Sequence, residues 1–193
     1  MSADFTAVAE NDVAQLIAQM PLCWIVPHGD PSAAILMPVV LESGHKSLLG
    51  HLPLRAPAAD ALRGNTRASF LFLGANGYVS PADAGLADWA PTWNFVSAKL
   101  IGTVSLDPGI TREAVEAVVK LMEGPDGWNI GAIEHRYDTL AANIIGFRAA
   151  IENIIPRFKL GQDERPEVRS RIADALAGAP IGEWMRRVSL SSS

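Results

Sequence analysis

The apolar positions along this chain recur at two spacings, one typical of helices and one typical of strands. Val13, Leu16 and Ile17 follow the capping residues Asn11 and Asp12 at helical spacing, and a proline at position 21 ends the run. Apolar runs of strand length come next. We predict strands over 21–26, 33–41, 46–52, 67–73, 77–80, 93–106 and 144–160.

Three features of these predicted strands carry further information. Pro38 interrupts the second run, and because proline cannot donate to a sheet ladder it indicates an edge, a bulge or a backbone segment that faces a ligand. Gly74-Ala75-Asn76 reads as a turn between the fourth and fifth runs. The run 93–106 alternates, with Leu100, Gly102, Val104 and Leu106 on one face and Lys99, Ile101, Thr103 and Ser105 on the other. A long strand with one polar face is typical of an antiparallel barrel.

Helices are predicted between and after the strands, at 57–63, from Thr111, over 133–143 and from Pro166. In the helix from Thr111, the apolar stripe is Val115, Val118, Val119 and Met122. This order indicates an α+β protein built on an antiparallel split β-barrel with peripheral helices, and it disfavours a parallel doubly wound sheet. We expect one domain over residues 1–193, with a C-terminal helical extension from about residue 165.

Composition narrows the class of protein. Hydrophobic residues make up 49% of the chain and charged residues 19%, which excludes a disordered chain. No apolar run approaches the roughly 18 residues that a membrane span requires, and the first residues do not resemble a signal peptide. Cys23 is the only cysteine and lies in an apolar run, so we expect a packed core thiol. These features predict a cytoplasmic protein without a membrane partner.

The charge pattern argues against a broad nucleic-acid surface. The formal net charge is −5, whereas binding to phosphates requires clustered cations. Arginines gather only near the C-terminus, at positions 165, 169, 171, 186 and 187, and acidic residues lie between them. Solvated helix faces explain such interleaving, and a local contact to DNA or to an anionic ligand stays open.

Standard catalytic and metal motifs are missing from the sequence. It contains neither a glycine-rich phosphate loop nor a nucleophile elbow. The four histidines, His28, His45, His51 and His135, lack metal-ligand spacing, so we expect no metal site. The catalytic residues, if there are any, cannot be assigned, and a hydrolase is disfavoured.

The most distinctive residues form two nearby blocks, Tyr78-Val79-Ser80-Pro81 and Pro91-Thr92-Trp93-Asn94. They resemble the "YVSPxWY … VPTWNY" segment of the PaiB-type FMN-binding negative transcriptional regulators. Gly50-His51, with Pro57, is similar to the family's "GHVARANP". Lys159-Leu160 and Gln162, followed by Arg169, are similar to its "KLSQNxxxxDR". The resemblance implies a split barrel that forms homodimers and holds FMN in clefts between the two subunits.

The candidate cofactor-binding residues are therefore His51, Arg55, Tyr78, Ser80, Trp93, Asn94, Lys159 and Gln162. Trp93 can cover a flavin ring, the neutral polar groups can meet the edge of the ring, and Lys159 and Arg55 can oppose a phosphate. Each also has a structural alternative. Trp93 can anchor a core or an interface, the polar side chains can satisfy turns and backbone groups, and the cations can be ordinary surface charges.

Several polar positions of the family pattern are lost. Ile35-Leu36-Met37-Pro38 stands where the family reads "NHLP", Leu54 and Ala56 replace Arg and Asn, and Arg55 is displaced by one residue. Three functions therefore stay open: an FMN-binding regulator or redox protein, a barrel dimer that has lost its flavin, and an oxidoreductase of the flavin-reductase or pyridoxamine-phosphate-oxidase type.

Overall fold

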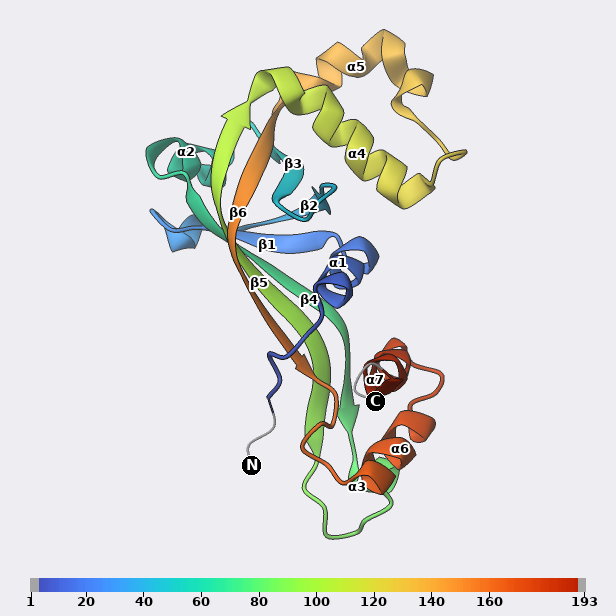
Figure 1. Ribbon diagram of the computed structural model, residues 1–193. Helices are drawn as coiled ribbons and strands as arrows, with labels where there is room; N and C mark the ends of the chain where they lie inside the picture. The colour runs from blue at the N-terminus through green and yellow to red at the C-terminus, as the bar shows by residue number, and fades with distance from the viewer. Residues whose placement is uncertain (1–3, 191–193) are drawn as a thin grey trace. The chain divides into compact units, whose positions relative to one another are not determined.

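The structure is a computed structural model, and it describes residues 4–190. Figure 1 shows the order of its elements along the chain. The strands are β1 (Leu22–Pro27), β2 (Ile35–Leu41), β3 (Ser47–Pro53), β4 (Arg67–Val79), β5 (Thr92–Asp107) and β6 (Ile144–Lys159). The α-helices are α1 (Glu10–Gln19), α2 (Pro57–Gly64), α3 (Pro81–Ala84), α4 (Thr111–Glu123), α5 (Glu134–Ala141), α6 (Pro166–Ala175) and α7 (Pro180–Leu190). Short 3-10 turns are η1 (Pro31–Ala33), η2 (Pro108–Ile110) and η3 (Ile130–Ile133).

The six strands close into a barrel in the order β1-β2-β3-β6-β5-β4. The β1–β2, β1–β4, β2–β3 and β3–β6 pairs are antiparallel. The β1–β2 and β2–β3 pairs join successive strands through short connections, whereas β1–β4 and β3–β6 bring together strands that are distant in the sequence. The α+β class and the antiparallel split barrel with peripheral helices are thus confirmed. Pro38 lies opposite Leu22 of β1, and its strand β2 has a neighbour on each side in the closed barrel. The interpretation of Pro38 as an edge-strand residue is therefore wrong.

The contacts within the chain form two compact units, and the long strands β4, β5 and β6 contribute to both. The first unit comprises residues up to Val13, 73–98 and from 155 onward, and the second comprises 14–72 and 99–154. The prediction of a single domain stays a prediction. The helical extension begins at Pro166, close to the expected residue.

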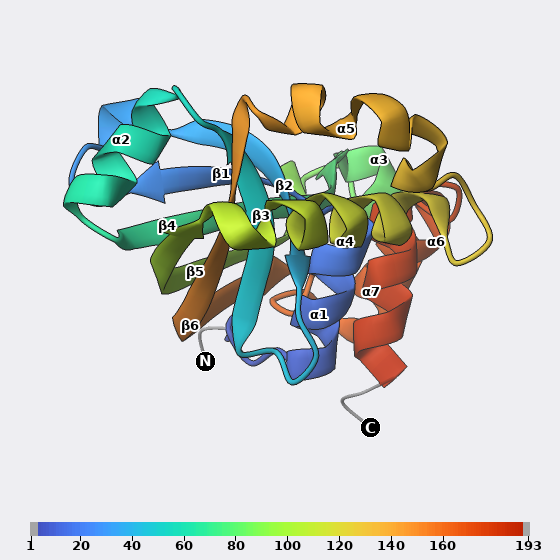
Figure 2. The same ribbon diagram turned by 90° about the horizontal axis from the view of Figure 1, so that it is seen from above.

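Each unit has its own aromatic core. In the second unit, Phe70 and Phe147 stack at 6.2 Å between ring centroids, and α4 packs against β2 and β3 (Figure 2). In the first unit, Phe158 and Trp184 meet edge to face at 5.4 Å, and α6 packs against α3 and α7. Full burial of each such ring stabilises the fold by roughly 1.5–3 kcal/mol. The expected core position of Cys23 is confirmed, because it is buried, and burial raises the pKa of its thiol to about 12.

Three local predictions are wrong. Residues 67–79 form one continuous strand, β4, with no turn at 74–76. Met122 does not belong to the buried stripe of α4, because it is 64% exposed, whereas Thr111 and Ala114 are buried. The C-terminal helical residues form two helices, α6 and α7, whereas a single helix from Pro166 was predicted.

The C-terminal arginines are not simply solvated. Arg169 donates to the carbonyl oxygens of Leu160 and Met185, and Arg186 donates to that of Ala173. Arg187 pairs with Asp12 at 2.9 Å. These side chains link α6, α7 and Asp12 of α1 within the first unit. The alternation of charges in the sequence did not reveal that these arginines stabilise the packing of helices. No helix within residues 4–190 has the length and apolar character needed to cross a membrane.

Candidate functional site

An exposed aromatic pair stands at the junction of β4 and β5 in the first unit. Tyr78 and Trp93 lie 5.9 Å apart between ring centroids, with their planes at 65°. Each side chain remains about half exposed. The Trp93 indole N–H donates to Asn76 Oδ1 at 3.3 Å, and Asn76 Nδ2 donates in turn to the Gly74 carbonyl at 3.0 Å. The pair is therefore an oriented aromatic surface that is open to a planar partner.

Asn94 follows Trp93 in β5, and strand alternation sends its side chain to the opposite face. It is 1% exposed, and its Nδ2 donates to Met185 Sδ of α7 at 3.4 Å. Its Oδ1 is buried and has no partner among residues 4–190. The structure thus separates two neighbours that the sequence pattern had grouped: Trp93 faces outward, and Asn94 faces the packed interior of the first unit.

Ser80 and Gln162 form hydrogen bonds within their own turns. Ser80 caps α3 in a capping box with Asp83, whose pKa is lowered by hydrogen bonds from the Ser80 backbone N–H and hydroxyl. Gln162 accepts from the Leu160 N–H and donates to the Phe158 carbonyl, each at 2.6 Å. Both side chains organise chain turns, which was the alternative interpretation of each.

Lys159 lies at the end of β6, where its ammonium group donates to the Thr92 hydroxyl. Thr92 directly precedes Trp93, so a half-buried cation stands near the start of the strand that carries the exposed indole. An ammonium group has three donors, so this contact leaves donors available for an anion.

His51 and Arg55 belong to the second unit. His51 lies in β3 opposite Gly146, and its Nδ1 is buried without a partner among the described residues. Burial lowers the pKa of His51, so the neutral ring is favoured. Arg55 is exposed in the turn before α2, and its guanidinium makes no hydrogen bond or ion pair with the rest of residues 4–190. It is a free donor fork for a carboxylate or a phosphate.

One surface escaped the sequence analysis altogether. Leu36, Trp24 and Leu71 stand side by side on β2, β1 and β4, because Trp24 pairs with both of the others. All three are exposed, Trp24 by 50%. We call these residues the apolar row. Runs such as 21–26 and 33–41 are apolar on both faces, so their sequence does not reveal which face is uncovered.

Solved structures with this fold come from several bacteria. The FAD and heme binding protein from Mycobacterium smegmatis has a TM-score of 0.63 at 17% identity, covering 81% of this chain and 74% of its own. A conserved hypothetical protein from Mycobacterium tuberculosis has a TM-score of 0.61 at 14% identity, covering 86% and 94%. The flavocytochrome Anf3 from Azotobacter vinelandii has a TM-score of 0.61 at 14% identity, covering 81% and 74%. At such identities the likeness establishes the split-barrel fold.

No protein with a curated description matches the sequence. A family profile described as "Putative FMN-binding domain" matches residues 1–153, which include all the predicted site residues except Lys159 and Gln162. The match supports FMN, or another flavin, as the cofactor. It spans well over half of the 193 residues, so this chain belongs to the family of that FMN-binding domain.

Proposed function

We propose that this protein is a homodimeric, PaiB-like flavoprotein that holds FMN against the Tyr78–Trp93 pair and serves a redox role. The observation that supports this proposal best is the pair itself. The two aromatic rings meet at 65°, Asn76 accepts from the Trp93 indole N–H, and both side chains remain about half exposed. Aromatic surface of this kind suits a flat ring system.

The donors in the first unit fit a flavin in part. Trp93 and Tyr78 offer ring faces, and Lys159 offers a cation for a phosphate or for the polar edge of the ring. Ser80, Asn94 and Gln162 fit less well, because their polar groups are engaged or turned inward. We therefore place Tyr78, Trp93 and Lys159 ahead of those three. A bound flavin would supply electron-transfer chemistry, and these side chains would bind it and shield one of its faces from water.

His51 and Arg55 are separate candidates from the second unit. Arg55 has an unengaged guanidinium, which suits a phosphate through two parallel hydrogen bonds. Burial lowers the pKa of His51, which favours the neutral ring, and the unsatisfied Nδ1 of that ring suits a ligand donor. Single substitutions test each residue on its own.

The apolar row supports the homodimer. Three large apolar side chains on adjacent strands form a flat exposed face, and a two-fold axis would set this face against its own copy. Exposed apolar surface of this kind marks an interaction site. Residues outside the row must add to the contact, because a stable dimer buries about 800 Å² on each partner.

A redox role is favoured over direct DNA binding. The net charge is −5, and Arg169, Arg186 and Arg187 are engaged within the protein. Few clustered cations therefore remain for a phosphate backbone. Proteins with the same fold include one that binds FAD and heme and one flavocytochrome, so redox cofactors recur on this scaffold.

A barrel dimer without flavin is the second candidate. The observation that favours it is that Ser80 and Gln162 are engaged within their own turns and Asn94 faces the interior, together with the exposed apolar Leu36 in place of a polar residue. A flavin reductase or a pyridoxamine-phosphate-oxidase-like enzyme is a further alternative, which turnover with a reduced nicotinamide would identify.

The test is equilibrium binding of FMN to the full chain. Binding is measured from the change in flavin fluorescence and from the rise in the unfolding temperature of the protein. Trp93→Leu should weaken binding at least tenfold, and Lys159→Gln should weaken it in a salt-dependent way. Leu140→Ala, at an exposed apolar position on α5, is the control and should bind as the wild type does. Wild-type affinity in Trp93→Leu would exclude the proposed site, and absence of binding by the wild type would favour the flavin-free candidate. An absorption scan of the same protein would also show haem, if any is present.

A further inference from the structure

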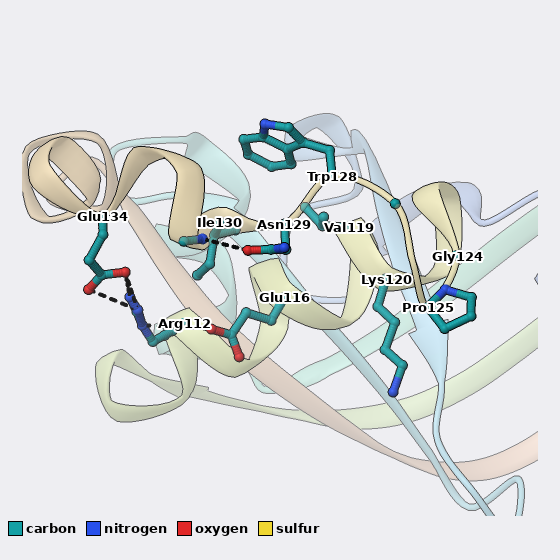
Figure 3. Close-up of a pocket in the computed structure, with 12 residues that line it drawn as sticks. Arg112, Glu116, Val119, Lys120, Gly124, Pro125, Trp128, Asn129, Ile130 and Glu134 are labelled. Carbon is teal, nitrogen blue, oxygen red and sulfur yellow. Dashed lines mark hydrogen bonds and ion pairs between the residues drawn. The ribbon is translucent and has the colours of Figure 1, made fainter.

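A pocket lies on α4, entirely within the second unit, and its lining includes none of the residues considered for flavin. It has a volume of about 500 Å³, a size suited to a small molecule. Its floor is one face of α4, formed by Arg112, Glu116, Val119 and Lys120 at helical spacing. Its wall is the segment 124–131, which leaves the helix and returns over it (Figure 3).

The wall is a turn whose shape is fixed by two glycines and by a side-chain hydrogen bond. Gly124 has φ +79, a backbone conformation that other residues rarely adopt. A Cβ on Gly127 would lie 2.2 Å from the Glu123 carbonyl oxygen, so only glycine fits there. Asn129 Oδ1 then accepts from the Gly131 N–H at 3.0 Å and starts η3. These constraints hold Trp128 between them in a defined place.

Trp128 is the unusual member of the wall. Its indole lines the pocket and is 46% exposed, and its N–H has no partner among residues 4–190. A turn that is held in shape on both sides therefore presents an aromatic ring to an open pocket. Stacking of a flat molecule on this ring would remove apolar surface from water and gain an aromatic contact.

The charges in the pocket select the ligand further. Arg112 donates to both carboxylate oxygens of Glu134. Its Nε lies 3.8 Å from Glu116 Oε1, and its guanidinium carbon lies 4.4 Å from the centroid of the Tyr137 ring. Both carboxylates are thus held by one arginine, and Glu134 raises the pKa of Arg112. Lys120, by contrast, makes no ion pair with the described residues. The donors of the lining that have no partner within residues 4–190 include the Lys120 ammonium and the Trp128 indole N–H.

The two donors lie on either side of an apolar patch. In the view of Figure 3, Trp128 lies above Val119 and Lys120 extends below it. A ligand that covers Val119 can therefore place a ring against the indole and an anionic group toward the ammonium. We infer that this pocket binds a small planar aromatic acid, with its ring on Trp128 and its carboxylate on Lys120.

Calorimetric titration of the full chain with quinoline-2-carboxylate tests the inference, with cyclohexanecarboxylate as the non-planar probe. The wild type should bind the aromatic acid saturably and at least tenfold more tightly than the saturated acid. Trp128→Leu should weaken binding about tenfold, which corresponds to about 1.4 kcal/mol, and Trp128→Phe should recover part of the loss. Lys120→Gln should weaken binding about threefold and remove most of its salt dependence. Lys46→Gln, an exposed lysine before β3, should leave the affinity unchanged.

A cooperative thermal unfolding transition verifies that each variant is folded. If Trp128→Leu does not fold, the affinity of Trp128→Phe, which should be weaker than that of the wild type, decides the test. Saturation of the protein with FMN beforehand should not change the titration, because the two proposed sites share no residue. The inference is overturned by an unsaturable titration, by equal affinity for the two acids, by wild-type affinity in Trp128→Leu, or by competition with FMN. Success or failure here is independent of the flavin proposal.

Discussion

Replacement of Trp24 by alanine tests the apolar row as a homodimer interface. Trp24 stands at the centre of the row, and half of its side chain is exposed. A tryptophan presents about 250 Å² at most, so about 125 Å² would be buried by a partner, and alanine would forfeit about 100 Å² of this. At about 25 cal/mol per Å², the loss is roughly 2.5 kcal/mol for each chain.

Two-fold symmetry places Trp24 in the interface twice, so the dimer loses about 5 kcal/mol in total. That loss corresponds to an increase in the dimer dissociation constant of roughly 4,000-fold. Sedimentation velocity over a dilution series measures this constant directly. Trp24→Ala should sediment as a monomer at concentrations where the wild type is a dimer, and its circular dichroism should match that of the wild type.

The matched control is Leu140→Ala, which also truncates an apolar side chain that is about half exposed, but on α5. It should dissociate as the wild type does. Trp24→Phe should restore much of the association because it keeps an aromatic side chain on the row. A wild type that is monomeric at all concentrations, or a Trp24→Ala protein that dissociates like the wild type, would refute the reasoning.

Three further predictions concern single side chains. Cys23 should not react with a thiol reagent in the native state and should react fully in urea, because its buried thiol has a pKa of about 12. The absorbance of the released reagent measures the reaction, and rapid labelling of the native protein would contradict the prediction. His51 has a pKa below its ordinary value of 6.5, so the unfolded chain takes up a proton before the folded chain does, and the free energy of unfolding should fall as the pH drops through 6.5. Urea titrations at about pH 7.5 and about pH 5.5 measure this effect, and the free energy of unfolding of His51→Gln should fall less between the two pH values than that of the wild type. An equal fall in the two proteins would count against a buried neutral ring. Ser80→Ala should lower the free energy of unfolding by about 1 kcal/mol through loss of the α3 cap. It should leave FMN affinity unaltered, whereas a selective loss of FMN affinity would show that the hydroxyl contacts the cofactor.

Much of the fold could be predicted from the sequence because local and tertiary preferences agree in most elements. The apolar stripe and the terminating proline of the first predicted helix agree with α1, but α1 begins at Glu10, so Asn11 and Asp12 lie in its first turn and the prediction that one of them caps the helix is wrong. In β5 the alternation of apolar and polar residues matches the buried and exposed faces from Lys99 to Ser105. The resemblance in the Tyr78 and Trp93 blocks also indicated an FMN-binding domain, which is the family to which the profile assigns the chain.

Predictions that depended on distant partners succeeded less often. Gly74-Ala75-Asn76 has the composition of a turn, yet pairing within the sheet keeps the backbone extended through it. Asn94 appeared to belong with Trp93, but alternation along β5 turned it toward Met185, more than ninety residues away. Arg186 was interpreted as a surface charge, whereas its guanidinium donates a hydrogen bond to the Ala173 carbonyl oxygen on α6. Such contacts join segments that are remote in sequence, and single-residue propensities do not encode them.

The absorption spectrum of the protein, purified under native conditions without added cofactor, is the most direct test of the account. A flavoprotein that holds FMN on the Tyr78–Trp93 pair should be yellow, with two visible absorption bands, and should release flavin on denaturation. Trp93→Leu should be purified with less flavin than the wild type. A colourless wild-type protein that neither binds added FMN nor gains thermal stability from it would contradict the central claim.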